Sequence, residues 1–160
     1  MSKLAVIVLG HSRSGKSKTW NTLFDRGVRT GPGIRELHLT DDLTIPVFLV
    51  SGSPEERQQY VGDIISDNKP RVVLCSLQYI EGGRQSIQYF VDTGYQLFVQ
   101  WLNPGYSDDG VLPDSLGFLS YLLYNGAVVS MRDGQREPEQ RVREIRNYLI
   151  GWVSNRRLGW

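Results

Sequence analysis

The most informative stretch of the chain is Leu4-Ala5-Val6-Ile7-Val8-Leu9-Gly10-His11-Ser12-Arg13-Ser14-Gly15-Lys16-Ser17. Its first six residues are continuously apolar, which is typical of a parallel strand covered on both faces. The remaining residues match the spacing G-x-x-x-x-G-K-[ST] in full and are termed the glycine loop (Gly10–Ser17). After them, Lys16–Arg26 places Trp20, Leu23 and Phe24 on one helical face. A strand, a loop and a helix are therefore predicted in that order.

The glycine loop has the composition of a phosphate-binding site. Glycine permits backbone conformations closed to other residues and lets the main chain approach a ligand closely. Successive N–H groups and the positive end of the following helix form a cradle for anions. In such a cradle Lys16 reaches the β- and γ-phosphates, and the Ser17 hydroxyl ligates Mg²⁺. The predicted nucleotide-binding residues here are Gly10, His11, Ser12, Arg13, Ser14, Gly15, Lys16, Ser17 and Lys18.

The rest of the chain alternates short apolar runs with helical periodicity, which indicates an α/β domain. Only Asp41–Leu43 separates Arg35–Thr40 from Thr44–Val50. This connection is too short for a crossover helix, so the two segments should form an antiparallel hairpin. The pattern predicts further strands at Arg71–Ser76, Tyr95–Leu102 and Ala127–Met131, and further helices at Ser53–Ile65, Gly83–Thr93, Asp114–Tyr124 and Glu137–Val153. We expect a three-layer α/β fold with six strands, mostly parallel, and about five helices.

Composition narrows the function classes. The 160 residues are 40% hydrophobic and 22% charged, and 18 basic side chains face 17 acidic ones for a net charge of +1. Such a balance gives no overall positive field, so nucleic acid is an unlikely partner. Cys75 is the only cysteine and lies in an apolar run, which favours a buried thiol and a reducing compartment. No apolar run reaches the length of a membrane span, and we expect a cytoplasmic protein.

The glycine loop resembles that of the P-loop NTPase superfamily, and the order of elements is similar to a small Ras-like GTPase. The resemblance implies a single P-loop NTPase domain over residues 1–160, with a Ras-like strand order and one antiparallel strand. It further implies a bound nucleoside triphosphate, GTP or ATP, with Mg²⁺, and a partner protein. By the same likeness Gly52 would contact the γ-phosphate through its N–H. Thr30, in the loop Gly27–Gly33, would complete the Mg²⁺ coordination; the alternative is an incidental threonine in a flexible connector.

Several family residues are replaced in this chain. Leu49 occupies the place of the aspartate that orients Mg²⁺, and Ser53 that of the catalytic glutamine. Guanine recognition in the family uses an N-K-x-D run, and the matching segment, Trp101–Pro104, lacks the aspartate. The resemblance therefore leaves adenine and guanine equally open and implies slow hydrolysis.

Three functions are compatible with these residues. The first is a GTPase-like switch or slow NTP hydrolase that acts through a partner, with Lys16 and Arg13 as catalytic residues. Arg13 would supply charge to the transition state in cis, unless it is simply exposed to solvent. The second is a small-molecule or nucleotide kinase, with Asp41 or Asp42 as base and Arg132, Arg136 or Arg141 clamping phosphates. The third is a scaffold that acts only by protein contacts. The hairpin is the discriminating feature, because a tight turn remote from Lys16 excludes those two aspartates as the kinase base.

Overall fold

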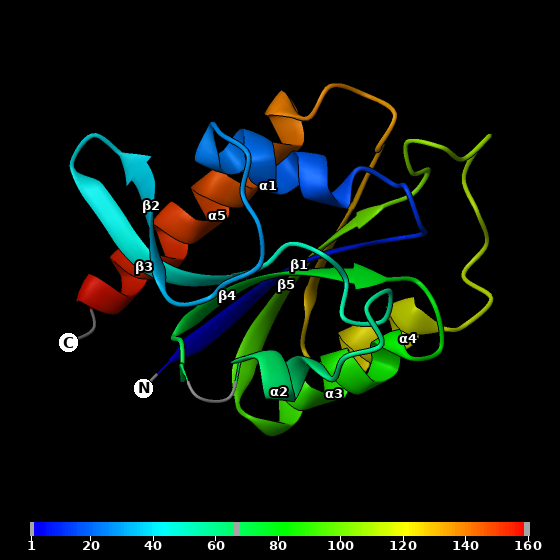
Figure 1. The fold of residues 1–160 in the computed structure, drawn as a ribbon, viewed down its shortest axis with the longest axis horizontal. Coiled ribbons are helices and arrows are strands. Elements are labelled where there is room, and N and C mark those ends of the chain that lie inside the picture. The colour runs from blue at the N-terminus through cyan, green and yellow to red at the C-terminus, as the bar shows by residue number, and fades with distance from the viewer. Residues whose placement is uncertain (1, 66–67, 159–160) are drawn as a thin grey trace.

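A computed structural model describes residues 2–65 and 68–158. Strands and helices largely alternate along the chain (Figure 1). The strands are β1 (Lys3–Gly10), β2 (Arg35–Thr40), β3 (Leu43–Val50), β4 (Val72–Gln78), β5 (Tyr95–Leu102) and β6 (Val128–Arg132). The helices are α1 (Lys16–Phe24), α2 (Val61–Ile65), α3 (Gly83–Asp92), α4 (Phe118–Tyr124) and α5 (Glu139–Leu158). The described residues thus confirm the α/β class, the six strands and the five helices.

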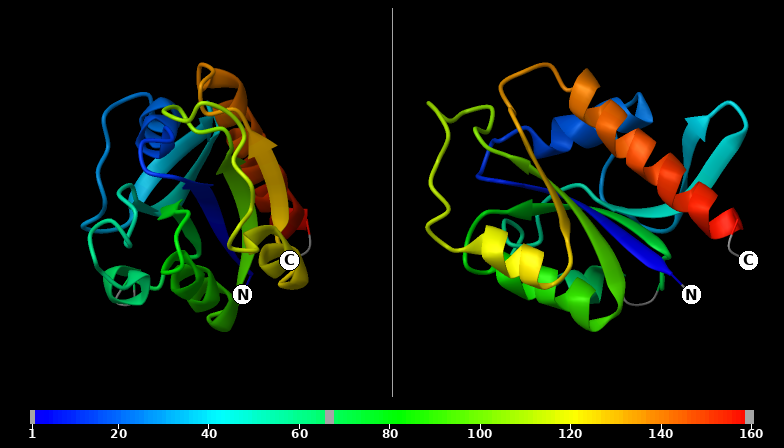
Figure 2. Two further views of the ribbon diagram at one scale, coloured as in Figure 1. Left: turned by 90° about the vertical axis from the view of Figure 1, so that its right-hand side faces the viewer. Right: turned by 180° about the vertical axis from the view of Figure 1, so that it is seen from behind.

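One mixed sheet forms the middle layer. Its strand order is β2-β3-β4-β1-β5-β6, and only the β2–β3 pair is antiparallel. Helices α1 and α5 cover one face, and α2, α3 and α4 cover the other (Figures 1 and 2). Each face has its own core cluster, with Trp20 and Ile145 in one and Phe90 and Phe118 in the other. Because β1 is enclosed by neighbours and helices, its residues Leu4 to Leu9 are all buried.

The expected Ras-like strand order is wrong. In that order the third strand lies beside the first, whereas here β4 lies between β3 and β1. The β4 run pairs with β1 over its whole length, from Leu4↔Val72 to Gly10↔Gln78. By contrast, β3 meets β4 only through Phe48, Leu49 and Val50. The apolar runs of β3 and β4 are of similar length, and either could pair with β1. Local sequence does not specify which of them does.

The helix expected from Ser53 is also shorter than predicted. Residues 54–58 form turns, and α2 begins only at Val61. Gln58 has a φ of 53°, a left-handed conformation that interrupts helical hydrogen bonding. The Ser53 hydroxyl, at the start of the expected helix, is buried and has no hydrogen-bond partner among the described residues. Instead, the Glu55 carboxylate accepts hydrogen bonds from Gln78 N and Ser86 Oγ, which ties this segment to β4 and α3.

Cys75 is a buried free thiol in β4, and burial raises its pKa well above the ordinary value. None of the described helices combines the length and the apolar composition that a membrane span requires.

Candidate functional site

The glycine loop lies at the carboxyl end of β1 and leads directly into α1. In open α/β sheets, ligands bind outside the carboxyl ends of the strands. Arg13 has a φ of 59° and Gly15, which caps α1, has a φ of 102°. These left-handed residues turn the chain sharply between strand and helix. The α1 N-terminus, with its unpaired N–H groups and positive dipole end, is therefore presented at the sheet edge.

The Lys16 side chain folds back over the loop. Its Nζ donates to the carbonyl oxygens of Gly10 at 3.2 Å and His11 at 2.7 Å, and lies 3.3 Å from Ser14 Oγ. The residue is only 6% exposed. Burial lowers the pKa of Lys16, while the carboxylates of Glu56, Glu55 and Asp108 act in the opposite direction. The ammonium is thus fixed at the centre of the loop, with Glu56 Oε1 at 3.8 Å.

Two further loops pack against Ser14 and leave no room for side chains. A Cβ placed on Gly105 would lie 2.6 Å from Ser14 Cβ, and one on Gly134 would lie 2.5 Å from the Ser14 carbonyl oxygen. Tyr106 N donates to Ser14 O at 3.1 Å, and Gly134 N donates to Pro104 O at 2.7 Å. The loops after β5 and β6 therefore brace the glycine loop through backbone contacts, which only glycine permits at these distances.

Arg141 supports the glycine loop from α5. Its Nε donates to Thr19 Oγ1 at 3.3 Å, and Thr19 Oγ1 donates to Gly15 O at 3.0 Å. Arg141 Nη1 binds Arg136 O at 3.0 Å, but Nη2 has no partner among the described residues. A Cβ on Gly15 would lie 3.2 Å from this Nη2. Arg141 is 4% exposed, so a buried positive charge sits behind the start of α1.

A cavity of about 440 Å³ opens over the loop and is termed the loop cavity. It is lined by Arg13, Ser14, Gly15, Lys16, Ser17, Lys18, Glu56 and Tyr106. Three of these residues carry positive charge and one, Glu56, carries negative charge. The volume falls in the range of small-molecule sites. The arrangement can hold a small polyanion between backbone N–H groups and cationic side chains.

The structure brings together most residues predicted around the glycine loop. Arg13, Ser14, Gly15, Lys16, Ser17 and Lys18 line the loop cavity. Gly10 contributes its carbonyl oxygen to Lys16, and Ser12 is exposed. His11 does not line the cavity; its ring packs on Tyr79, with centroids 4.9 Å apart.

Thr30 and Gly52 meet each other rather than the loop cavity. Thr30 Oγ1 accepts hydrogen bonds from Ser51 N at 3.0 Å and Gly52 N at 3.4 Å. Neither Thr30 nor Gly52 lines the cavity. Because two N–H groups occupy the Thr30 hydroxyl oxygen, this residue could ligate a metal only after these contacts are released. In the described part of the chain, no three His, Cys, Asp or Glu side chains gather as a metal site.

The remaining candidates lie elsewhere. Asn103 uses both side-chain atoms on the backbone of Leu112, donating to its O at 2.9 Å and accepting from its N at 2.8 Å. It is therefore occupied as a structural link. Asp41 and Asp42 form the tight β2–β3 turn, at the opposite end of the sheet from the glycine loop (Figures 1 and 2).

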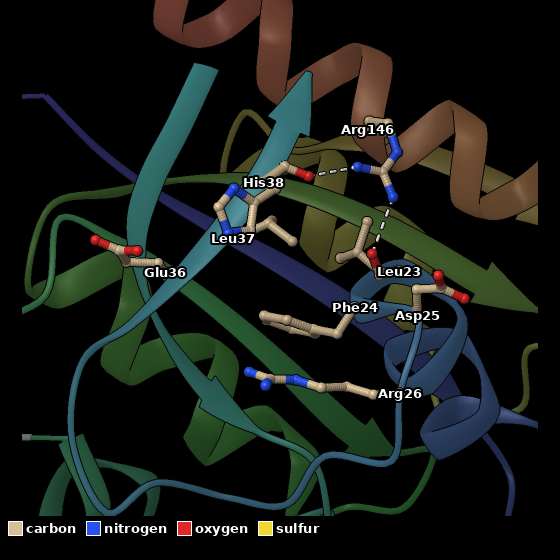
Figure 3. A pocket seen from close by; sticks show the side chains of 8 residues that line it. All are labelled: Leu23, Phe24, Asp25, Arg26, Glu36, Leu37, His38 and Arg146. Carbon is tan, nitrogen blue, oxygen red and sulfur yellow. Dashed lines mark hydrogen bonds between the residues drawn. The ribbon is translucent and has the colours of Figure 1, made fainter. Parts of the chain in front are cut away.

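A second cavity of about 610 Å³, the hairpin cavity, lies between α1, β2 and α5 (Figure 3). It is lined by Leu23, Phe24, Asp25, Arg26, Glu36, Leu37, His38 and Arg146. Arg146 donates to His38 O at 2.7 Å and to Leu23 O at 2.9 Å. This arginine therefore joins the last helix to the edge strand and to the end of α1.

Sequence reasoning missed the bracing residues Gly105, Gly134 and Tyr106, and assigned no supporting role to Arg141. The signal for the two glycines was present, since both lie in loops that follow β5 and β6, whose carboxyl ends share the edge with β1. Their contact with Ser14 depends on loop conformation, which spacing does not reveal. No family model matches the chain, and no curated protein sequence is significantly similar to it.

Proposed function

We propose that this protein binds a nucleoside triphosphate with Mg²⁺ at the glycine loop, as P-loop NTPases do. The observation that carries the proposal is the position of the Lys16 ammonium, inside a loop cavity with a surplus of positive charge. Two of its hydrogen bonds, to Gly10 O and His11 O, hold it in place. The third contact, to Ser14 Oγ at 3.3 Å, is longer than an ordinary N–H···O bond. A phosphate oxygen can replace that contact at little cost.

The residues around the loop cavity fit the metal that accompanies a triphosphate. Mg²⁺ in nucleotide sites is held by one or two protein oxygens together with phosphate oxygens and water. Ser17 supplies a hydroxyl and Glu56 a carboxylate, and both residues line the cavity. The metal would neutralise charge on the phosphates when bound. Ser17 and Glu56 are therefore sufficient as protein ligands of a Mg²⁺ that is also held by phosphate and water.

The same geometry favours a switch or slow hydrolase over rapid catalysis. Arg13 borders the cavity and is exposed, so its guanidinium can reach a bound phosphate and offset developing charge. Among the described residues that line the cavity, Glu56 is the one carboxylate, and it is paired with Lys16. It must leave that ion pair before it can orient a water molecule. A partner protein that draws Glu56 away from Lys16 would accelerate turnover.

The Thr30 contact offers the moving part that a switch requires. It ties the loop Gly27–Gly33 to the end of β3 through two hydrogen bonds on one hydroxyl. A bound Mg²⁺ and γ-phosphate would compete for Thr30 Oγ1 and Gly52 N. The loop would then take a second position and present a different surface to the partner protein.

The kinase alternative loses its proposed base, because Asp41 and Asp42 lie in the hairpin turn away from Lys16. The scaffold alternative predicts no nucleotide affinity. Calorimetric titration with ATP and GTP, with and without Mg²⁺, separates the two remaining functions. We expect Mg²⁺-dependent binding that Lys16→Ala weakens by about a hundredfold or more.

Lys3→Ala is the matched control, since its ammonium packs over Tyr95 at the other end of β1. This variant should bind as the native protein does. Phosphate release measured on the same samples should be slow in the native protein and absent in Lys16→Ala. Native protein that binds neither nucleotide would contradict the proposal and favour a scaffold.

A further inference from the structure

Tyr106 is an exposed aromatic residue on a fixed backbone beside the glycine loop. It is 62% exposed and lines the loop cavity together with Lys16, Ser17 and Lys18. An exposed tyrosine is common on protein surfaces and needs no function on its own. Its position at the rim of a cationic cavity is the feature that requires an explanation.

The backbone around Tyr106 is held on both sides. Its own N–H donates to Ser14 O at 3.1 Å, and the next N–H, of Ser107, donates to Arg13 O at 3.2 Å. Asp108 closes the turn, since its Oδ2 accepts from Gly105 N at 2.8 Å. The ring is therefore presented by a segment already ordered against the phosphate cradle. Little conformational entropy remains to be lost when a ligand packs on it.

The loop cavity contains few groups that distinguish one base from another. The described residues that line it include no asparagine, glutamine or aspartate, and their one carboxylate, Glu56, is paired with Lys16. The nearby amide of Asn103 is committed to Leu112, as described above. A base placed here would meet an aromatic face and cationic side chains, but no amide that reads its edge. Stacking on an aromatic ring tolerates every base, because each base has a π-face.

The size of the cavity indicates that it accepts a ligand larger than phosphate. Its volume of about 440 Å³ exceeds the needs of a small anion. Arg141 does not line the cavity, but its buried guanidinium, whose Nη2 has no partner among the described residues, adds positive charge behind the start of α1. The cavity thus joins a polyanion subsite at Lys16 to an aromatic rim at Tyr106.

We propose that Tyr106 is the platform on which the base of a bound nucleoside triphosphate stacks, and that the site takes adenine and guanine nucleotides with little preference. This inference rests on the proposed function, because the triphosphate must occupy the glycine loop for its base to reach Tyr106. It adds the substrate class, nucleoside triphosphates selected by their phosphates and not by their base.

The test compares ATP, GTP and inorganic tripolyphosphate as ligands of the native protein, Tyr106→Ala and Tyr106→Phe. We expect Tyr106→Ala to weaken ATP and GTP binding equally, by about tenfold or more, and to leave tripolyphosphate binding unchanged. Tyr106→Phe keeps the ring and should bind both nucleotides as the native protein does. Tyr124→Ala is the matched control, because Tyr124 is exposed at the end of α4 and does not line the loop cavity.

The outcomes distinguish failure of the Tyr106 platform from failure of the phosphate site. If tripolyphosphate binds and Tyr106→Ala keeps native affinity for both nucleotides, Tyr106 is not the platform, while phosphate binding at the glycine loop is supported. A preference of the native protein for one nucleotide above about tenfold also overturns the inference. Native protein that binds none of the three ligands overturns both. Unchanged tripolyphosphate binding by Tyr106→Ala shows that the variant is folded, so a loss of nucleotide affinity then supports the platform.

Discussion

The loop cavity and the hairpin cavity differ in how their cations are used. In the larger hairpin cavity, the positive charges of Arg26 and Arg146 are matched in number by the carboxylates of Asp25 and Glu36. The Arg146 guanidinium donates hydrogen bonds to backbone carbonyls of β2 and α1 (Figure 3). In the smaller loop cavity, three cations face one carboxylate, and a helix N-terminus adds its own positive charge. The comparison shows that charge balance and backbone geometry, not volume, identify the functional candidate.

The largest effect is expected where the bracing of the loop cavity is broken. Gly134→Ala would place a Cβ 2.5 Å from the Ser14 carbonyl oxygen, and backbone cannot move aside as a side chain can. We expect a loss of about 2–3 kcal/mol in unfolding free energy, as in overpacked cores, and loss of nucleotide binding. Denaturant unfolding measures the first and calorimetry the second. Gly110→Ala is the control, since no atom of a described residue beyond its chain neighbours lies within 4 Å of its Cβ position. Equal effects of the two variants would argue against the bracing.

At the hairpin cavity we expect a change in stability without a change in binding. Arg146→Ala removes the hydrogen bonds to His38 O and Leu23 O, which join α5 to β2 and α1. The expected cost is about 1–2 kcal/mol of unfolding free energy, the scale of lost hydrogen bonds from a charged group. The exposed Arg143→Ala on the same helix should cost little. If Arg146→Ala abolished nucleotide binding, the separation of the two cavities would be wrong.

Arg141→Met should weaken binding by about fivefold with a small change in stability. The substitution removes buried positive charge behind the α1 N-terminus while keeping much of the side-chain volume. The stability change should be small because the loss of two hydrogen bonds is offset by the removal of a buried Nη2 that has no partner among the described residues. Titration with tripolyphosphate and thermal unfolding measure the two effects, with Arg143→Met as control. A large loss of stability with native affinity would make Arg141 a structural residue only.

The order of elements along the chain was predictable, whereas the spatial order of the strands was not. The short Asp41–Leu43 connection correctly predicted the β2–β3 hairpin, since three residues cannot form a crossover. The place of β4 beside β1 depends on long-range pairing, and both β3 and β4 offered a suitable apolar run. Helix α2 was predicted too long because Gln58 adopts a left-handed conformation that Ser53-Pro54 does not reveal.

At the site, sequence reasoning located the glycine loop but not its surroundings. A local spacing singled out Lys16 and its neighbours, and several of these residues line one cavity. Thr30 and Gly52 were proposed by analogy of position, and in the structure they contact each other and do not line that cavity. The contacts of Gly105, Gly134 and Arg141 come from loops and a helix far along the chain. Such contacts depend on the folded arrangement, so no local pattern reports them.

The smallest effect is expected at the carboxylate of the loop cavity. Glu56→Gln removes the anion that competes with phosphate for Lys16, so affinity for tripolyphosphate measured without Mg²⁺ should rise by about threefold, the modest scale of a partly exposed ion pair. Glu81→Gln, in an exposed ion pair with Arg84, is the control and should leave affinity unchanged. Unchanged or weaker binding of metal-free tripolyphosphate by Glu56→Gln would contradict this competition.

The same pair gives a pH dependence with a defined sign. Phosphate binding requires the protonated ammonium, and burial lowers the pKa of Lys16 below the ordinary 10.5. Affinity should therefore fall as pH rises through this lowered pKa, before an ordinary lysine would lose its proton. The Glu56 carboxylate raises the pKa of Lys16. Its removal in Glu56→Gln should therefore lower that pKa and move the decline in affinity to lower pH still. Calorimetric titrations across alkaline pH measure both curves, and a decline in Glu56→Gln at higher pH than in the native protein would contradict this assignment.

Amide hydrogen exchange with and without Mg²⁺–ATP tests most directly whether the glycine loop is the binding site. In the proposed complex, successive backbone N–H groups of the glycine loop face the phosphates, so binding should slow the exchange of these amides. We predict new protection within Gly10–Ser17, and none within Leu23–Arg26 or Glu36–His38 around the hairpin cavity. Unchanged exchange across Gly10–Ser17, or protection confined to the hairpin cavity, would contradict the account.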